Sequence, residues 1–268
     1  MQTALIVSTI VCLVLVGVVA ALPRLLARRG VTMRRTRFGT TLVFDSADAD
    51  GTPVRLLNVN GTYQSVSYVQ PELRFELACV YHRNMAEVIE ACGARRVLVV
   101  GGGGYSLPKY LATHGTARID AVEVDPKVTA LAREFFFLGE AEEVAGDRLR
   151  LENGDGWDYL RAASEPFDVI VNDAFSGNRP LGPLKTDEGA RVVHEHLAPG
   201  GVYLANVRCA VEGRKSRTLH EVIEAFGNEF AHVAYVPEWP DKPSEPGNNT
   251  FVASDRQLRL PAAAVVVR

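Results

Sequence analysis

Residues 97–105 have the sequence VLVVGGGGY, and residues 122–126 have the sequence VEVDP. The first stretch predicts a buried strand followed by a glycine turn, and the second predicts another strand that ends in an acid. Glycines after a buried strand let backbone N–H groups approach a ligand closely, and an acid about 20 residues further on can accept hydrogen bonds from ribose hydroxyls. We therefore expect an adenosine derivative to be bound by Gly101, Gly102, Gly103, Gly104 and Glu123.

Two later strands also end in polar residues. Residues 149–156, LRLENGDG, place Asp155 and Gly156 after one strand, and residues 167–173, FDVIVND, place Asp173 after the next. The carboxyl ends of parallel strands meet at one edge of a sheet, where ligands bind in open α/β folds. In this crevice Asp155 could accept a hydrogen bond from adenine, or it could instead cap the helix that follows. A dinucleotide remains an alternative ligand, although its loop would carry a further glycine.

The glycine loop and these acids resemble the spermidine synthases, which are polyamine aminopropyltransferases with the fold of class I S-adenosylmethionine-dependent methyltransferases. The resemblance extends from about residue 55 to about residue 255, and it includes NGTYQS at residues 60–65 and YHRNM at residues 81–85. It implies an α/β fold with a Rossmann-like, doubly wound, mostly parallel sheet. It also implies aminopropyl transfer from decarboxylated S-adenosylmethionine to an amine, and it makes a homodimer an expectation.

The resemblance further implies roles for individual residues. Glu123 would hold the ribose of the donor, and Asp155 with Gly156 would hold its adenine. Asp173 would be the general base, because the attacking amine must lose a proton although its pKa in solution is near that of lysine. The residues that would line the substrate pocket are Tyr81, His82 and Gln64. For Tyr81 and His82, the alternative is simple packing on an apolar helix.

The chain departs from the spermidine synthase pattern at two positions. Gly104 and Ser176 stand where the family carries aspartates that help to bind cationic amines. Each missing carboxylate removes a charge-assisted hydrogen bond worth about 1.5 to 3 kcal/mol, so we expect weaker binding of putrescine. Gly104 would also leave room for the carboxylate of intact S-adenosylmethionine. The alternatives are therefore an S-adenosylmethionine-dependent methyltransferase on the same fold, and a non-catalytic, membrane-tethered nucleoside-binding or scaffold protein.

The N-terminal segment is strongly apolar. Residues 1–23 contain no charged side chain, and residues 4–22 would measure about 28 Å as a helix, which is enough to cross a bilayer. Arginines follow at positions 24, 28, 29, 34, 35 and 37. We therefore expect one N-terminal transmembrane helix in the cell membrane, with the catalytic domain on the cytoplasmic side. The alternative is a signal peptide that ends near residues 20–21.

After this predicted anchor, 1–23, the chain divides into three parts. Residues 24–40 are expected to be a basic juxtamembrane linker without a fold of its own. Residues 41–70 predict a small antiparallel β region, because apolar runs alternate there with the turn signals DG and NG. Residues 71–268 predict the catalytic domain, in which strands and helices alternate. Near its end, the loop 237–247 contains Glu238, which could contact an amine or lie in a solvated connection.

Charge and composition exclude some classes of function. A formal net charge of -3 predicts no nucleic-acid partner. The four cysteines and six histidines show no spacing typical of metal ligands, so we expect neither a metal nor a disulfide. The expected partner is a small-molecule amine or another small acceptor.

Overall fold

The structure is a computed structural model that describes residues 21–176, 179–180 and 182–268. Its main strands are β5 (Arg96–Val100), β6 (Arg118–Glu123), β7 (Leu149–Asn153), β8 (Phe167–Asn172), β11 (Leu197–Cys209), β12 (His232–Val236), β13 (Gly247–Ser254) and β14 (Val265–Val266). They form one eight-stranded sheet in the order β14-β12-β13-β11-β8-β5-β6-β7, parallel from β11 to β7, with β13 antiparallel between β11 and β12. A short ladder joins β9 (Phe175–Ser176) to β10 (Arg179–Pro180). The sheet is the Rossmann-like, mostly parallel sheet that the sequence predicts.

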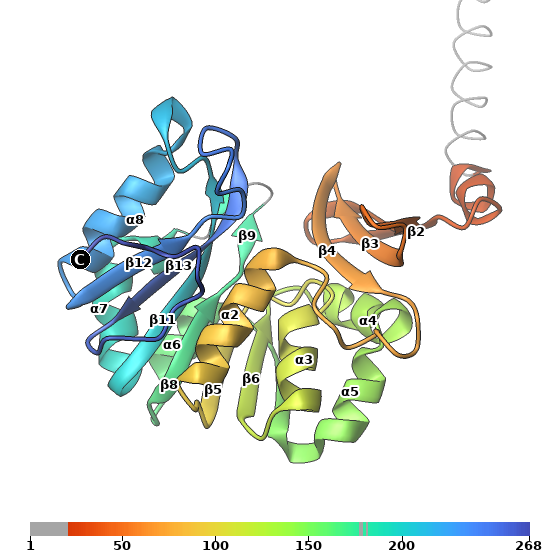
Figure 1. Ribbon diagram of the computed structural model, residues 1–268. Coiled ribbons are helices and arrows are strands. Elements are labelled where there is room, and N and C mark those ends of the chain that lie inside the picture. Colours follow the sequence, from red (N-terminus) through yellow and green to blue (C-terminus); the bar gives the residue numbers. More distant parts are fainter. Residues whose placement is uncertain (1–20, 177–178, 181) are drawn as a thin grey trace, which may run out of the picture.

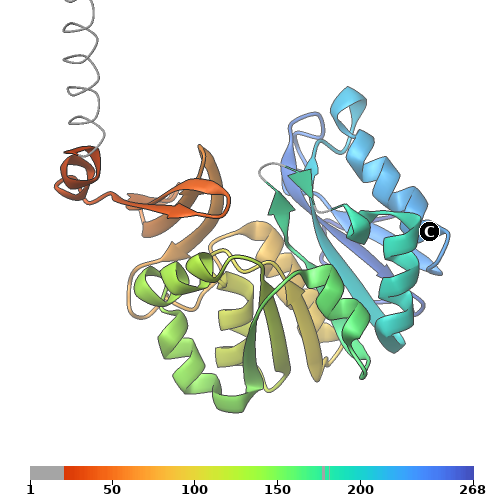
Figure 2. The ribbon, with the colours of Figure 1, turned by 180° about the vertical axis from the view of Figure 1, so that it is seen from behind.

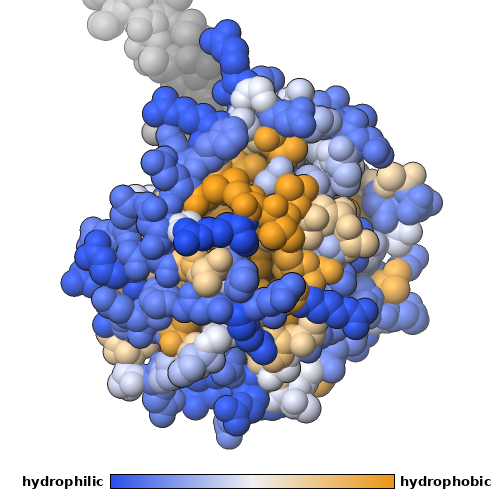
Figure 3. Space-filling model, turned by 60° about the vertical axis from the view of Figure 1, so that its left-hand side comes forward, coloured by the Kyte–Doolittle hydropathy of each residue, from blue (hydrophilic) through white to orange (hydrophobic). Residues whose placement is uncertain are grey.

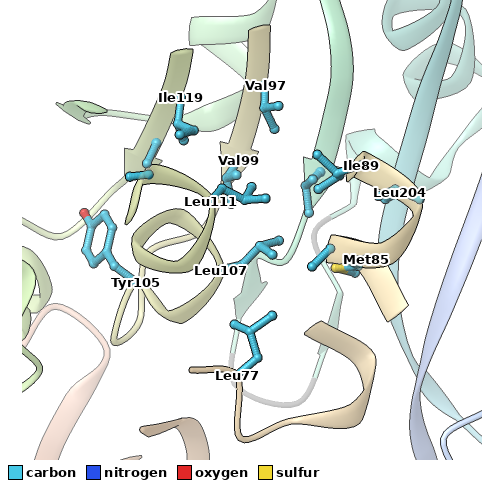
Figure 4. Close-up of a cluster of buried hydrophobic side chains, with 14 of the residues drawn as sticks. Leu77, Met85, Ile89, Val97, Val99, Tyr105, Leu107, Leu111, Ile119 and Leu204 are labelled. Atoms are coloured by element: carbon cyan, nitrogen blue, oxygen red, sulfur yellow. The ribbon is translucent and has the colours of Figure 1, made fainter. Parts of the chain in front are cut away.

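Helices cover both faces of this sheet (Figures 1 and 2). One face carries α2 (Val80–Ala91), α3 (Ser106–His114), α4 (Pro126–Phe135) and α5 (Leu138–Ala145), and the other carries α6 (Gly156–Ala162), α7 (Asp187–His196) and α8 (Arg217–Gly227). Val97 and Val99 of β5 belong to the apolar cluster under the first set (Figure 4), whereas Leu98 and Val100 belong to the cluster under the second. Because both faces are buried, this strand is continuously apolar. The face shown in Figure 3 is mostly hydrophilic, apart from a hollowed area where apolar side chains gather.

The register of the parallel strands brings the predicted site residues to one edge. Val100, the last residue of β5, pairs with Val122 of β6 and with Asn172 of β8. Each strand therefore ends at the same level, so the glycine loop, Glu123 and Asp173 come together where the chain leaves the sheet. This edge is the crevice in which open α/β folds bind ligands.

A smaller antiparallel sheet precedes the large one. Its strands β1 (Thr32–Thr36), β2 (Gly39–Ala47), β3 (Pro53–Val59) and β4 (Thr62–Tyr68) pair in chain order. Strand β1 and the start of β2 thus lie within residues 24–40, where the sequence predicts a linker without a fold. They form because β1 pairs with β2 along its whole length and because the buried hydroxyls of Thr36 and Thr41 hydrogen-bond to each other at 2.9 Å. The hydroxyls of Ser67 and Ser106, 3.1 Å apart, connect this sheet to α3.

The predicted transmembrane helix needs correction. In the part of the chain that the structure describes, no helix is long and apolar enough to span a membrane. Most of the predicted anchor, residues 4–20, lies outside the described residues. Because the described residues contain no such helix, the membrane anchor, the membrane as a partner and the cell-membrane localisation that depended on it are not carried further.

Candidate active site

The loop that follows β5 consists of glycines, and neighbouring groups occupy the space where side chains would lie. A Cβ atom on Gly101, where φ is +105°, would lie 2.6 Å from the carbonyl oxygen of Asp173. A Cβ atom on Gly102 would lie 2.7 Å from the ring of Tyr105 and 2.9 Å from Oε2 of Glu123. The close approach of these segments therefore requires glycine at both positions.

Glu123, at the end of β6, is buried against this loop. Its Oε2 accepts a hydrogen bond from the N–H of Gly102 at 2.8 Å, and its Oε1 accepts one from the N–H of Asp125 at 2.9 Å. Burial raises the pKa of Glu123 above its usual value, although the backbone hydrogen bonds oppose this effect. The carboxyl group therefore lies beside the glycine loop, where the sequence predicts the ribose of the ligand.

The next two predicted site residues are Gly104 and Gln64, and both lie beside other parts of the protein. A Cβ atom on Gly104 would lie 2.5 Å from Oγ of Ser65 and 3.1 Å from the ring of Phe136. The position that a Cβ of residue 104 would take is therefore occupied by Ser65 and Phe136. Gln64 lies next to the loop, because its carbonyl oxygen is 3.3 Å from the position of a Cβ on Gly103. Among the described residues, no hydrogen bond joins the Gln64 side chain to the other predicted pocket residues.

Asp155 and Gly156 lie at the start of α6. Oδ1 of Asp155 accepts hydrogen bonds from the N–H groups of Trp157 at 2.8 Å and Asp158 at 3.3 Å, so this side chain caps the helix. A Cβ atom on Gly156 would lie only 2.2 Å from Cγ1 of Val100. Glycine therefore allows the helix to begin directly against the end of β5, next to the glycine loop.

Asp173 follows β8 and lies among polar side chains from three other elements. Its Oδ2 accepts hydrogen bonds from Nε2 of His82 at 2.8 Å and from the hydroxyl of Tyr81 at 3.3 Å. Its Oδ1 accepts a hydrogen bond from Nδ2 of Asn206 on β11 at 2.9 Å. The first turn of α2 supplies Tyr81 and His82, and the hydroxyl of Thr250 on β13 donates to the carbonyl of Tyr81 at 3.2 Å. Tyr81 and His82 are thus buried residues that also contact Asp173.

The interaction between His82 and Asp173 has a clear electrostatic effect. Burial alone would lower the pKa of His82, but the hydrogen bond to Asp173 and its charge, with a smaller contribution from Cys79, outweigh it and raise the pKa from 6.5 to about 9. Burial, and then the charge of Asp173, raise the pKa of Tyr81 well above its usual value. At neutral pH, a cationic His82 therefore donates to Asp173 and balances its charge.

Two buried polar atoms in this cluster have no hydrogen-bond partner within the described residues. One is Oδ1 of Asn206, and the other is Nδ1 of His82, which lies near Cys79 without a hydrogen bond of normal geometry. Buried polar atoms are usually paired, so an unpaired acceptor beside Asp173 can receive an N–H from a bound ligand. The sequence reasoning missed Asn206. The available signal was a single amide inside the apolar strand GVYLANV.

Within the same described residues, no group of three or more His, Cys, Asp or Glu side chains is arranged to hold a metal ion. The polar cluster at Asp173 and the loop at Gly101 instead offer one carboxylate, one imidazolium, hydroxyl and amide groups, and backbone N–H groups. Such a set can bind an amine and accept a proton from it.

Comparison with known proteins agrees with the family that the sequence motifs resemble. The model of the spermine/spermidine synthase domain matches residues 78–243. A polyamine aminopropyltransferase of Pectobacterium atrosepticum is 27% identical over 204 residues, which make up 74% of this chain and 67% of that protein. A polyamine aminopropyltransferase of Sodalis glossinidius is 31% identical over 163 residues, which make up 58% of this chain and only 55% of that protein.

The fold agrees with a solved structure. The crystal structure of a probable spermidine synthase from Corynebacterium glutamicum matches with a TM-score of 0.68, covering 84% of this chain and 80% of that chain. The sequence identity in this match is 24%, so it shows a common fold and no more. The segment 78–243 contains the glycine loop, Glu123 and the side chains that donate to Asp173.

Proposed function

Because the chain belongs to the spermine/spermidine synthase family, we propose that it transfers an aminopropyl group from decarboxylated S-adenosylmethionine to the nitrogen of a small amine. The resemblance to the spermidine synthases that the sequence predicts is confirmed by this family match, and the relatives indicate a transferase. One observation supports the proposed reaction most directly. The backbone of Asp173 touches the glycine loop at Gly101, so its carboxylate belongs to the same crevice as the predicted donor site.

We assign the donor to the glycine loop, Glu123 and the start of α6. The glycines let the loop pack directly against Asp173, Tyr105 and Glu123, and a loop without side chains leaves its backbone N–H groups open to the close approach of a nucleoside. Glu123 would accept hydrogen bonds from the ribose hydroxyls in place of the bond from Gly102. Asp155 and Gly156 would contact the adenine at the N-terminus of α6, where Asp155 is exposed and already has its second oxygen available.

The reaction needs a neutral nucleophile. The lone pair of the amine nitrogen forms a bond to the methylene carbon beside the sulfonium sulfur, and the bond between that carbon and sulfur breaks. The sulfur keeps the electron pair, so neutral methylthioadenosine leaves. The amine loses one proton, which the carboxylate of Asp173 accepts. Positioning of the amine and the sulfonium in line supplies much of the rate.

The hydrogen bonds of Asp173 suit this role. A carboxylate offers about four acceptor positions, and His82, Tyr81 and Asn206 fill three of them. One position is left for the N–H of the amine, and the unpaired Oδ1 of Asn206 can accept a second N–H from the same nitrogen. The three donors fix the carboxylate so that it does not have to reorient during the reaction.

The experiment is product analysis with the full chain. Decarboxylated S-adenosylmethionine and 1,4-diaminobutane should give methylthioadenosine and an aminopropylated amine. The Asp173→Asn variant should lower kcat by about 10²- to 10⁴-fold while it keeps its affinity for the donor, as measured by calorimetry. The matched control is Asp147→Asn, which removes an exposed carboxylate that precedes β7, at the opposite end of that strand from the crevice.

Each other outcome contradicts a definite part of the proposal. Full activity in Asp173→Asn would exclude Asp173 as the base. Methyl transfer from intact S-adenosylmethionine, without aminopropyl transfer, would identify a methyltransferase. Donor binding without turnover for any amine would identify a non-catalytic nucleoside-binding protein.

A further inference from the structure

Glu238 lies in the loop between β12 and β13 and is held there by its neighbours. Its N–H donates to Oδ1 of Asn249 at 3.2 Å, and its Oε2 accepts from the N–H of Asn248 at 2.6 Å and from Nδ2 of Asn248 at 3.2 Å. Its other oxygen, Oε1, accepts no hydrogen bond from the described residues, and the side chain is half-buried. The carboxylate is therefore positioned by one oxygen and available through the other.

The strand register places Glu238 at the same edge of the sheet as the Asp173 cluster. It follows Val236, which pairs with Thr250, and Thr250 pairs in turn with Asn206 on β11. Thr250 also donates to the carbonyl of Tyr81, as described above. The raised pKa of Tyr81 has the charge of Glu238 among its causes, after burial, Asp173 and Cys79. Glu238 thus lies within electrostatic range of the hydroxyl that contacts Asp173.

The site carboxylates described above leave none for a second cation on the acceptor, because Glu123 and Asp155 are assigned to the donor. Asp173 already has its charge balanced by His82. Gly104 and Ser176 carry no acid. A diamine at neutral pH has two ammonium groups, because each amine has a pKa close to that of lysine. When one nitrogen loses its proton to attack the donor, the other still carries a charge that needs a partner in a partly desolvated site.

We propose that Glu238 binds the distal ammonium group of a diamine or polyamine acceptor and so selects acceptors that have a second cationic nitrogen. The inference rests on the proposed function, since the other nitrogen of the same acceptor is the one that attacks the donor. Glu238 is thereby a specificity residue that contacts the acceptor at the end opposite to Asp173.

The test compares two ligands of the same length that differ only at the distal end. These are 1,4-diaminobutane and pentylamine, in which a methyl group replaces the second amino group. Calorimetry with the full chain, at about pH 7.5, where both amines are protonated, and with saturating methylthioadenosine, gives the affinity for each. The wild type should bind the diamine about 10- to 100-fold more tightly. Glu238→Gln should remove this preference while its affinity for pentylamine stays the same.

The matched control is Glu245→Gln in the same loop, where the side chain is exposed and forms an ion pair with Lys242 at 4.0 Å. It should keep the preference for the diamine. A second variant, Glu238→Asp, keeps the negative charge but places the carboxylate one methylene closer to the backbone. It should therefore bind 1,5-diaminopentane in preference to 1,4-diaminobutane. Because Asp retains a carboxylate for Asn248, this variant is informative even if Glu238→Gln folds poorly.

The inference is overturned if the wild type does not distinguish the two ligands, or if Glu238→Gln binds the diamine as tightly as the wild type does. Failure of the proposed function gives a different result. In that case the diamine preference and its loss in Glu238→Gln remain, but no aminopropylated product forms. Product formation with an unchanged preference in Glu238→Gln would instead leave the proposed function intact and remove Glu238 from it.

Discussion

Replacement of His82 by Gln should change how the stability of the protein depends on pH. In the folded protein the pKa of His82 is raised from 6.5 to about 9, chiefly by Asp173 acting against burial. Each unit of pKa corresponds to about 1.4 kcal/mol, so protonated His82 with its neighbours Asp173 and Cys79, net of burial, contributes about 3 kcal/mol. Because the folded pKa is the higher one, this contribution is fully present below pH 6.5 and is lost as the pH rises through about 9.

The assay is urea unfolding of the wild type and of His82→Gln from about pH 6 to about pH 10, with the free energy of unfolding extrapolated to water. The difference between the two proteins should fall by about 3 kcal/mol over this range, because Gln can donate to Asp173 but carries no charge. We compare the difference in unfolding free energy between the two proteins, because the contributions of titrating groups that both proteins share cancel in this difference. His114→Gln, at a His whose side chain is 38% exposed, is the control and should change the stability by less than about 0.5 kcal/mol. A difference between wild type and His82→Gln that stays constant from pH 6 to pH 10 would refute the ion pair.

Three further predictions concern other parts of the fold. Burial lowers the pKa of Lys109 to about 7, so the folded state gains stability as the pH rises from about 7 to 10.5. The variant Lys109→Met should lack this pH-dependent gain. In urea titrations at pH 6 its free energy of unfolding should exceed that of the wild type by about 3 to 5 kcal/mol. Gly156→Ala places a Cβ atom 2.2 Å from Val100 and should cost about 1 to 3 kcal/mol, whereas Gly139→Ala, with no atom within 4 Å of the new Cβ, should not lower the melting temperature. Glu123→Gln should weaken donor binding by about 10- to 100-fold in calorimetry, and equal affinity would show that Glu123 does not contact the ribose.

The sequence predicted the parallel sheet because its signals are local. The run VLVV is typical of a strand buried on both faces, and the glycines that follow predict a turn in which neighbouring segments approach closely. The acids at 123 and 173 were found for the same reason, since each follows an apolar strand directly. These two acids lie at the same edge of the sheet because the strands that carry them are parallel.

Local signals were insufficient at the N-terminus. Hydropathy alone predicted a membrane anchor and an unstructured basic linker. The described residues contain no helix able to span a membrane, and β1 forms inside the predicted linker. Strand β1 has no strong signal of its own, because it is stabilised by pairing with β2 and not by its own apolar residues.

The sequence by itself thus determined the strands of the sheet, the glycine loop and the acids at the strand ends, because steric restriction and alternation of buried side chains act over a few neighbouring residues. Only the tertiary structure decided which side chains surround Asp173: His82 is 91 residues away in the chain, and Asn206 is 33 residues away. It also decided that Glu238 follows β12 at the same edge of the sheet, through the pairing of β11, β12 and β13. These contacts depend on strand register and on the packing of α2 against the sheet, which are properties of the whole fold, so no short stretch of sequence shows which side chains meet.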